Sequence, residues 1–336
     1  MGNHQNVLLW AQAENPHHEV RPVTENIQKT LYTVNPRGFC AGVERAIEVV
    51  DSLLRSEGTP LYVRKEIVHN KAVVDDFRSR GVVFVNELDE VPDFKTVVFS
   101  AHGVSPAVRQ EADRRNLNSV DATCPLVTKV HNEVIRHVAE NHEMILIGHT
   151  GHDEVLGTMG EAPGRISLVT CKEDVAGLDI ANDKSVAYAT QTTLSVDETE
   201  SIVSALRQRF PNLIEPEKSD ICYATQNRQD AVKELVEKGI EHLLVVGSES
   251  SSNSRRLCEV ALNLNVPATL IDGPEDLDIN LFNKLSTIGL TAGASAPEHL
   301  VQAVVEALVL ENWKPEELIT LEENVKFKLP GNLMGK

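Results

Sequence analysis

The sequence lacks any apolar run long enough to cross a membrane, and basic residues are few relative to acidic ones. Its 32 lysines and arginines stand against 50 aspartates and glutamates, so the net charge is -18 at pH 7 and the pI is ≈ 5.1. This charge argues against a protein that binds nucleic acids or anionic membranes. A local pocket can oppose the overall charge, so a small anionic ligand stays compatible with the composition.

Two nucleotide-binding signatures are also absent. The sequence contains neither the glycine-rich motif with lysine that cradles phosphates in P-loop proteins nor the G-x-G-x-x-G dinucleotide fingerprint. Residues 1–29 lack a basic segment followed by an apolar core, so they do not resemble a secretory signal, and their acidic residues argue against a transit peptide. We expect them to form a polar N-terminal extension that can be disordered.

Cysteine is scarce, with five residues in a chain of 336. An odd number of widely spaced cysteines indicates reduced thiols in the cytoplasm rather than a disulfide framework. The length exceeds one ordinary hydrophobic core, so two or three structural units are expected.

Cys40 lies in a glycine-rich turn between a strand pattern at residues 31–34 and a helical pattern at residues 43–54. A thiol beside a helix N-terminus has a lowered pKa and favours bound negative charge. A lone cysteine in such a place is more often buried and structural. The context recurs, however, at Cys124 and at Cys222, and each of these also precedes a helical pattern.

Strand and helix patterns alternate along the whole chain, which is typical of a parallel sheet, and the pattern repeats three times. The period is about 90 residues, too long for a solenoid. We therefore expect an α/β fold of three domains with small parallel sheets, related by a pseudo-threefold axis. The third domain has a helical pattern over residues 228–238. The predicted division is an extension at 1–29, domains at 30–118, 119–217 and 218–310, and a tail at 311–336 that packs back on the body.

The carboxyl ends of parallel strands collect ligand-binding loops. Three domains with these ends facing inward would bring Cys40, Cys124 and Cys222 to one centre. Three thiolates suit an iron–sulfur cluster that keeps one iron open for substrate. A Cys₃His zinc site and three unrelated core thiols are the alternatives. Cys171 and Cys258 lack the turn context, and we interpret them as ordinary thiols.

Polar side chains occupy loops that follow the predicted strands. Imidazoles, hydroxyls and an amide, together with backbone N–H groups at helix starts, suit phosphate oxygens, although each alone could be a surface residue or an N-cap. In the same loops, Glu154 is a candidate proton donor whose pKa would depend on burial and on the hydroxyl of Thr192. The candidate phosphate-binding residues are His69, His102, His152, Ser251, Ser252, Asn253 and Ser295.

Nine stretches of the chain resemble the 4-hydroxy-3-methylbut-2-enyl diphosphate reductase family, in one order and over essentially the whole body. They are NPRGFCAGVERA, YVRKEIVHN, SAHGVSP, DATCPLVTKVH, GHTGHDEVLGTMG, TQTTLSVDET, DICYATQNRQ, GSESSSNSRRL and TAGASAPEHLV.

This resemblance implies a trefoil of three α/β domains around one 4Fe-4S cluster per chain, held by Cys40, Cys124 and Cys222. It implies an iron–sulfur oxidoreductase that reductively dehydroxylates (E)-4-hydroxy-3-methylbut-2-enyl diphosphate to isopentenyl and dimethylallyl diphosphates. That reaction is the final step of the methylerythritol phosphate isoprenoid pathway. The substrate hydroxyl would bind the open iron, where the two-electron reduction occurs. The seven polar residues named above would hold the diphosphate, Glu154 would deliver protons, and Thr192 would lie near the hydroxyl.

The resemblance also implies a protein partner, because electrons in this family come from ferredoxin or flavodoxin with its reductase. Two features depart from the family pattern. Asp153 stands between His152 and Glu154, where proline is common, and residues 1–29 are longer than in many members.

Two rival functions follow from the residues. One is a dehydratase with an open-iron cluster, which would take up no electrons. The other is a zinc-stabilised or redox-sensing cysteine protein, which would leave the histidine and serine loops without a role.

Overall fold

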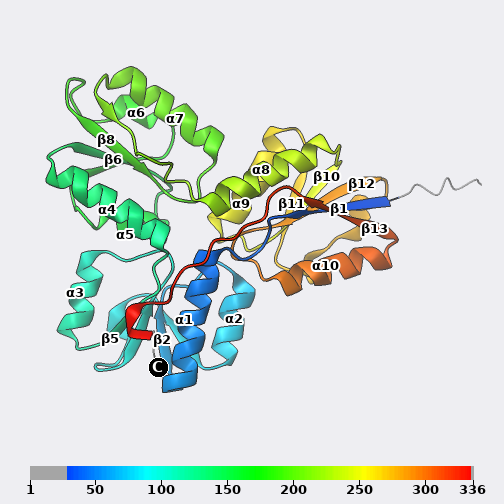
Figure 1. The fold of residues 1–336 in the computed structure, drawn as a ribbon, viewed down its shortest axis with the longest axis horizontal. Helices are drawn as coiled ribbons and strands as arrows, with labels where there is room; N and C mark the ends of the chain where they lie inside the picture. Colours follow the sequence, from blue (N-terminus) through cyan, green and yellow to red (C-terminus); the bar gives the residue numbers. More distant parts are fainter. Residues whose placement is uncertain (1–28, 334–336) are drawn as a thin grey trace, which may run out of the picture.

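The computed structural model describes residues 29–333, so the predicted extension lies, apart from Lys29, outside the described residues. Three parallel sheets, each covered by helices, form three lobes (Figure 1). This confirms the predicted α/β class with small parallel sheets. Within residues 29–333, no helix combines the length and the apolar character that a membrane span requires.

The first lobe is built on a four-stranded sheet. Its strands, in spatial order, are β3 (Val82–Val85), β2 (Leu61–Arg64), β4 (Thr96–Phe99) and β5 (Asn118–Asp121). Its helical segments are α1 (Ala41–Glu57), α2 (Lys71–Ser79), α3 (Pro106–Arg114) and the short 3-10 helix η1 (Leu88–Glu90). Apolar residues at helical spacing on α1, among them Ala46, Val50 and Leu53, bury one face of that helix in the core of the lobe.

The second lobe repeats this arrangement. Its strands are β7 (Ile166–Val169), β6 (Glu143–Ile147), β8 (Val186–Thr190) and β9 (Leu213–Ile214). Its helices are α4 (Pro125–Ala139), α5 (Asp153–Met159), α6 (Asp174–Gly177) and α7 (Val196–Arg209). Strand β8 is buried along its whole length, as expected for a central strand covered on both faces.

The third lobe has five strands. They are β11 (Ala268–Ile271), β10 (His242–Val246), β12 (Thr287–Ala292), β1 (Lys29–Asn35) and β13 (Trp313–Ile319). The helical segments are α8 (Tyr223–Glu237), α9 (Ser252–Asn263), α10 (Glu298–Leu310) and the 3-10 helices η2 (Pro274–Asp276) and η3 (Ile279–Phe282), with η4 (Gly331–Leu333) at the end of the described chain.

The strand before each cysteine belongs to a different lobe from the helix after it, which corrects the predicted division into domains. Strand β5 pairs with β4 before Cys124, β9 pairs with β8 before Cys222, and β1 pairs with β12 before Cys40. A first domain that begins with its own strand at residue 30 is therefore wrong, and a boundary at 119 cuts through β5. The chain passes from one lobe to the next at each cysteine, and β1 closes the ring.

Helix α8 also differs from the prediction, because it begins at Tyr223 rather than at residue 228. Its first turn is polar, so hydrophobic periodicity could not mark where it starts. Buried Arg228 lies on the face that a helical pattern would reserve for apolar residues.

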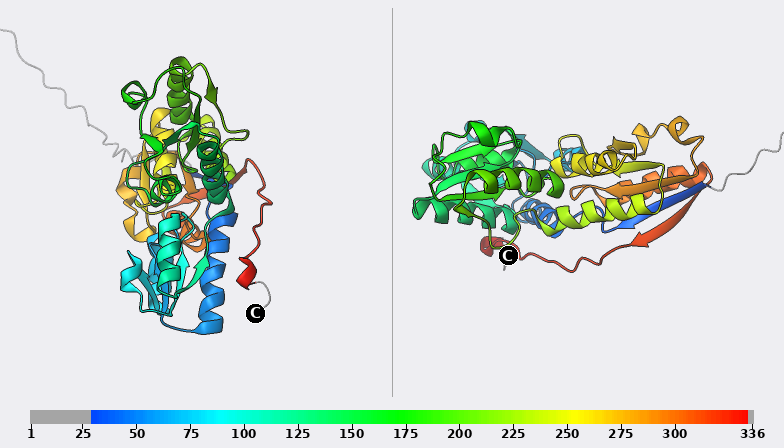
Figure 2. Two further views of the ribbon diagram at one scale, coloured as in Figure 1. Left: turned by 90° about the vertical axis from the view of Figure 1, so that its left-hand side faces the viewer. Right: turned by 90° about the horizontal axis from the view of Figure 1, so that it is seen from above.

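The C-terminal segment returns from the third lobe to the first (Figures 1 and 2). Strand β13 pairs with β1, and farther on Leu329 and Leu333 pack against the core that contains α1. Between them, Glu323 accepts a hydrogen bond at 3.0 Å from Arg228, whose buried guanidinium also donates to the carbonyl of Gly38 at 2.8 Å. This buried charge joins the tail, α8 and the turn before Cys40.

Replacing Glu323 with alanine is expected to lower the free energy of unfolding by about 3 kcal/mol, because it removes the carboxylate from a buried guanidinium. Urea denaturation at matched metal content measures this loss. Glu322→Ala is the control, since Glu322 is exposed and its loss should change the free energy by less than about 0.5 kcal/mol. Equal effects from the two variants would show that the tail does not depend on this ion pair.

Candidate active site

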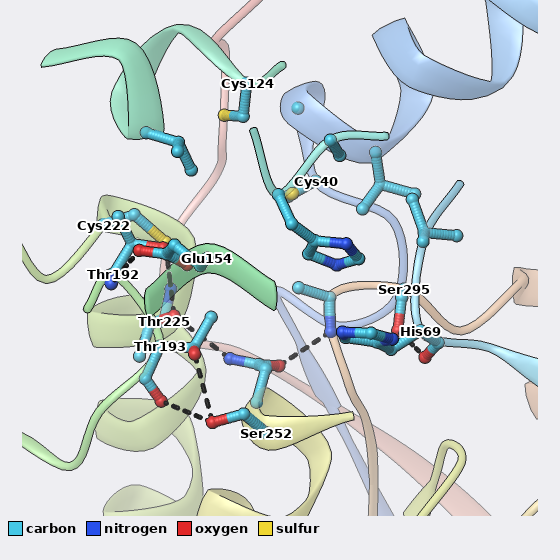
Figure 3. Close-up of a pocket in the computed structure, with 18 of the residues that line it drawn as sticks. Cys40, His69, Cys124, Glu154, Thr192, Thr193, Cys222, Thr225, Ser252 and Ser295 are labelled. Carbon is cyan, nitrogen blue, oxygen red and sulfur yellow. Dashed lines mark hydrogen bonds between the residues drawn. The ribbon is translucent and has the colours of Figure 1, made fainter. Parts of the chain in front are cut away.

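The three lobes meet at a pocket of ≈ 680 Å³ that is open to solvent, and all the site residues predicted from the sequence line it. The three cysteines point into it, Glu154 and Thr192 lie beside Cys222, and His69 lies beside Ser295 (Figure 3). The predicted convergence of loops from three domains is thus present in the structure.

Each of the three cysteines is the N-cap residue of a helix: Cys40 of α1, Cys124 of α4 and Cys222 of α8. The Cys222 sulfur accepts a hydrogen bond from the backbone N–H of Thr225 at 3.4 Å, in the place where serine or aspartate oxygens usually cap a helix. All three thiols therefore lie at the positive ends of helix dipoles, where negative charge is stabilised.

The backbone N–H of each cysteine is held by a loop of another lobe. Cys40 donates to Ala294 at 3.1 Å, Cys124 donates to Ala101 at 3.0 Å, and Cys222 donates to Thr192 at 3.0 Å. The three acceptor loops are equivalent, since they follow β12, β4 and β8. The position of every thiol is consequently fixed by two lobes at once.

The thiols of Cys40 and Cys124 approach each other over Gly42. A Cβ atom at Gly42 would lie 2.7 Å from the Cys124 sulfur and 3.8 Å from the Cys40 sulfur. Burial raises the pKa of Cys124 to about 12 and that of Cys222 to about 11, and neighbouring thiols add to both shifts. Burial thus favours the neutral thiols of Cys124 and Cys222, and a cation bound between the cysteines would convert them to thiolates.

Glu154 is buried with its carboxyl group against Thr192. One oxygen accepts the backbone N–H of Thr192 at 2.6 Å, and the other accepts its hydroxyl at 2.9 Å. Burial raises the pKa of Glu154 to about 7, although the two hydrogen bonds oppose the shift. A carboxyl group with this pKa carries a proton for part of the time at neutral pH and can give it up.

Three imidazoles gather on another side of the pocket. The rings of His69 and His102 stack with centroids 3.9 Å apart, and the His152 ring meets the His69 ring edge-on at 5.4 Å. Burial lowers the pKa of His152 to about 3 and that of His102 well below its usual value, and the neighbouring rings reinforce both shifts. Burial therefore favours the neutral rings of His102 and His152.

The tautomers of two of these rings follow from their partners. His152 caps α5 and accepts the backbone N–H of Glu154 at its Nδ1, at 3.2 Å, so its proton resides on Nε2. The Nδ1 atom of His69 lies 3.1 Å from a carboxylate oxygen of Glu66, to which it donates. His152 thus keeps a ring N–H that can serve an anionic ligand.

The third lobe contributes the N-terminus of α9 and the loop after β12. Ser251 is the N-cap of α9, and Ser252 and Asn253 occupy its first turn. The Asn253 amide is fixed at both ends, because its oxygen accepts the N–H of Ala294 at 2.8 Å and its nitrogen donates to Thr225 at 3.2 Å. A helix N-terminus of this kind is a ready site for an anion.

Two polar residues that line the pocket were not predicted from the sequence. Thr193 contacts the hydroxyl of Ser252 at 3.1 Å, and Thr225 lies 3.2 Å from the Cys222 sulfur. The signal for Thr225 was its place three residues after an N-cap, where the backbone N–H turns back to the cap. Thr193 stands next to Thr192 and carries no separate signal.

Asp153, which stands where proline is common in the resembling family, is the first residue of α5. Its carboxylate lies close to His69 and His102, with one ligand atom of each residue within 4.8 Å of the others. Aspartate in place of proline therefore leaves the start of α5 intact, and it places a carboxylate beside His69 and His102.

The first and second lobes touch through small residues beside the site. A Cβ atom at Gly160, the C-cap of α5, would lie 2.2 Å from the Cβ of Ser105, and one at Gly157 would lie 3.3 Å from the backbone of Gly103. This contact sets the separation between the loop that carries His102 and the helix that carries Glu154.

Comparison with known proteins gives a consistent result. A family model described as LytB protein matches residues 31–309. The 4-hydroxy-3-methylbut-2-enyl diphosphate reductase of Azotobacter vinelandii is 56% identical over 306 residues, which cover 89% of this chain and 96% of that protein. The protein of the same name from Pseudomonas aeruginosa is 54% identical over 309 residues, covering 90% and 98%.

Two solved structures are also similar. The E-1-hydroxy-2-methyl-but-2-enyl-4-diphosphate reductase of Plasmodium falciparum has a TM-score of 0.89 at 41% identity, covering 91% of this chain and 97% of that one. An (E)-4-hydroxy-3-methyl-but-2-enyl diphosphate reductase, described as the terminal enzyme of the non-mevalonate pathway, has a TM-score of 0.60 at 27% identity, covering 84% and 99%.

Gly160→Ala is expected to lower the free energy of unfolding by about 1–3 kcal/mol, because the new methyl group must push Ser105 and the first lobe away. Gly177→Ala is the control, since a Cβ there meets nothing within 4 Å. Urea denaturation compares the two variants. A tolerated Gly160→Ala would mean that the lobes do not depend on this close contact.

Proposed function

We propose that this chain, which belongs to the LytB protein family, is an oxidoreductase that converts (E)-4-hydroxy-3-methylbut-2-enyl diphosphate to isopentenyl and dimethylallyl diphosphates. Its relatives at 54–56% identity carry the name of this reductase. The observation that carries the proposal is a single pocket. It brings together three N-cap cysteines, a buried glutamic acid and the loops whose histidine, serine and asparagine side chains suit phosphate oxygens. The reaction would be the terminal step of the non-mevalonate pathway.

The thiols fit a 4Fe-4S cluster. Cys40, Cys124 and Cys222 supply three soft ligands, and no fourth cysteine lines the pocket among the described residues. Gly42 has no side chain where one would collide with the Cys124 sulfur, which leaves room between the thiols. When bound on three cysteines, such a cluster supplies electrons and one Lewis-acidic iron without a protein ligand.

The histidines and the α9 N-terminus would hold the diphosphate. The neutral ring of His152 can donate its Nε2 proton to a phosphate oxygen, and the negative charge of a bound diphosphate would raise the pKa values of His102 and His152, since it offsets the cost of burying imidazolium. Ser251, Ser252, Asn253 and Ser295 line the third-lobe wall. Binding energy from this end would fix the position of the reacting hydroxyl.

Glu154 would supply protons at the other end. Hydroxide is a poor leaving group, so the C–O bond breaks more readily when the oxygen leaves as water. Two electrons and two protons balance the reaction, with one proton leaving in water. The other forms a C–H bond at either of two allylic carbons, which accounts for two products. Thr192 holds the Glu154 carboxyl toward the pocket through both of its hydrogen bonds.

The reaction requires an external two-electron supply, and we assign it to ferredoxin or flavodoxin with its reductase. The five cysteines are free thiols, which fits a reducing compartment such as the cytoplasm. The rival dehydratase would need no reductant. Turnover of the diphosphate only when dithionite and a mediator are present would support the reductase, and turnover without them would overturn it.

Cys124→Ser is expected to lose most of the iron and acid-labile sulfide that the wild-type protein binds when purified without oxygen, because one of three thiolate ligands is gone. Cys171→Ser should retain both, since Cys171 does not line the pocket. Iron and sulfide analysis per chain measures this difference. If the wild-type protein contained zinc and no sulfide, the cysteines would form a structural metal site and the cluster assignment would be wrong.

Glu154→Gln is expected to keep the iron and sulfide content and to lower turnover by about 10²–10⁴-fold, because the amide cannot donate an acidic proton. In the wild type, turnover should fall as the pH rises through about 7, since the protonated carboxyl group is then lost. The residual activity of Glu154→Gln should lack this fall. A variant with near-normal turnover would remove Glu154 from proton delivery.

A further inference from the structure

The C-terminal end of α4 holds a cluster of titratable side chains that the reductase reaction does not use. It consists of His137 and Glu140, on the last turn and at the C-cap of the helix, and His142 just beyond. The Nδ1 atoms of the two histidines lie 3.2 Å apart, and a Glu140 carboxylate oxygen lies 3.8 Å from the first and 3.6 Å from the second.

The backbone builds this cluster. Asn141 adopts φ 61°, the left-handed conformation that ends a helix, and donates to Val138 at 3.1 Å. His142 then donates its N–H to the carbonyl of His137 at 3.0 Å. These two bonds define a Schellman motif, which brings the side chain two residues past the C-cap against one in the last turn.

Helices α3 and α9 end in the same motif, and there the paired side chains are apolar. At the end of α3, Leu117 bonds back to Ala112 at 2.9 Å, and at the end of α9, Val266 bonds back to Ala261 at 2.9 Å. All four of these residues are buried. At α4 two imidazoles with a carboxylate beside them take the place of the apolar pair. These groups pack less well than apolar side chains, but they are good metal ligands.

We propose that His137, Glu140 and His142 form a binding site for a divalent transition metal ion of the zinc class. A tetrahedral ion with bonds of about 2.0–2.1 Å separates its ligand atoms by about 3.3 Å, so the three observed distances need to change by only a few tenths of an ångström. Two imidazoles and one carboxylate are a common zinc ligand set, and they leave a fourth position for water.

Arg136 also contacts the ring of His137. An Nη atom of Arg136 lies 3.3 Å from the Nε2 of His137. Metal binding at Nδ1 moves the ring proton to Nε2, and Arg136, whose side chain is 47% exposed, can then turn away to solvent.

The site is separate from the reductase pocket. Helix α4 has 15 residues, so its C-terminal end lies about 22 Å from the N-cap Cys124. A metal there would fix the last turn of the helix whose first turn holds Cys124, and it would not need the substrate or the electron donor.

Equilibrium dialysis of the full-length protein, purified without oxygen, against buffered Zn²⁺ tests the proposal. The wild type is expected to bind one zinc ion more than His142→Ala, and Glu140→Gln to bind that ion at least tenfold more weakly. His299→Ala is the matched control, because His299 is an exposed histidine in the first turn of α10, and it should behave as the wild type. Circular dichroism and the urea midpoint verify that each variant is folded.

Zinc can also bind free thiols, so the neighbours of the metal must be identified. X-ray absorption of the additional zinc ion should show nitrogen and oxygen at about 2.0–2.1 Å, whereas cysteine sulfur would lie at about 2.3 Å. A sulfur shell for that ion, equal zinc uptake by the wild type and His142→Ala, or no uptake by the wild type would each overturn the site. None of these results depends on reductase activity.

Discussion

Three backbone hydrogen bonds hold the centre of the molecule together, and the rest of the structure is arranged around them. Each joins the N–H of a helix-capping cysteine to a loop carbonyl of another lobe, through the pairs Cys40 with Ala294, Cys124 with Ala101, and Cys222 with Thr192. Because each cysteine lies where the chain crosses between lobes, no single lobe can position its own thiol. The pocket therefore exists only in the assembled ring.

Burial sets the charge of this pocket. It raises the pKa values of Cys124, Cys222 and Glu154, and it lowers those of His102 and His152, so every one of these groups is shifted toward its neutral form. These five groups are therefore poised to gain charge from what the pocket binds. A cationic metal centre would favour thiolates at one side, and an anionic diphosphate would favour imidazolium at the other.

The repeat in the sequence predicted the three-lobed fold and the meeting of its loops, because strand ends and turn cysteines are local signals that recur. Sheet membership was not local. Strand β1 pairs with residues more than 250 positions away, so this strand was assigned to the wrong sheet. The first turn of α8 is polar, so hydrophobic periodicity did not reveal where this helix begins. Thr225 and His142 could not be singled out from the sequence, because their partners are side chains that meet only when the helix ends form. No pattern in the sequence predicted the contact between Glu323 in the tail and Arg228.

Asp153 shows why a departure from a family pattern can leave a site intact. Proline at this position would favour a helix start by fixing the backbone, but α5 begins here without it. His152 caps the helix, and a carboxylate in the first turn is favoured by the helix dipole. Glu154 is oriented from the opposite side by Thr192, whose own carbonyl is held by the N–H of Cys222. The pose of the glutamic acid thus depends on the interlocked ring rather than on the residue that precedes it.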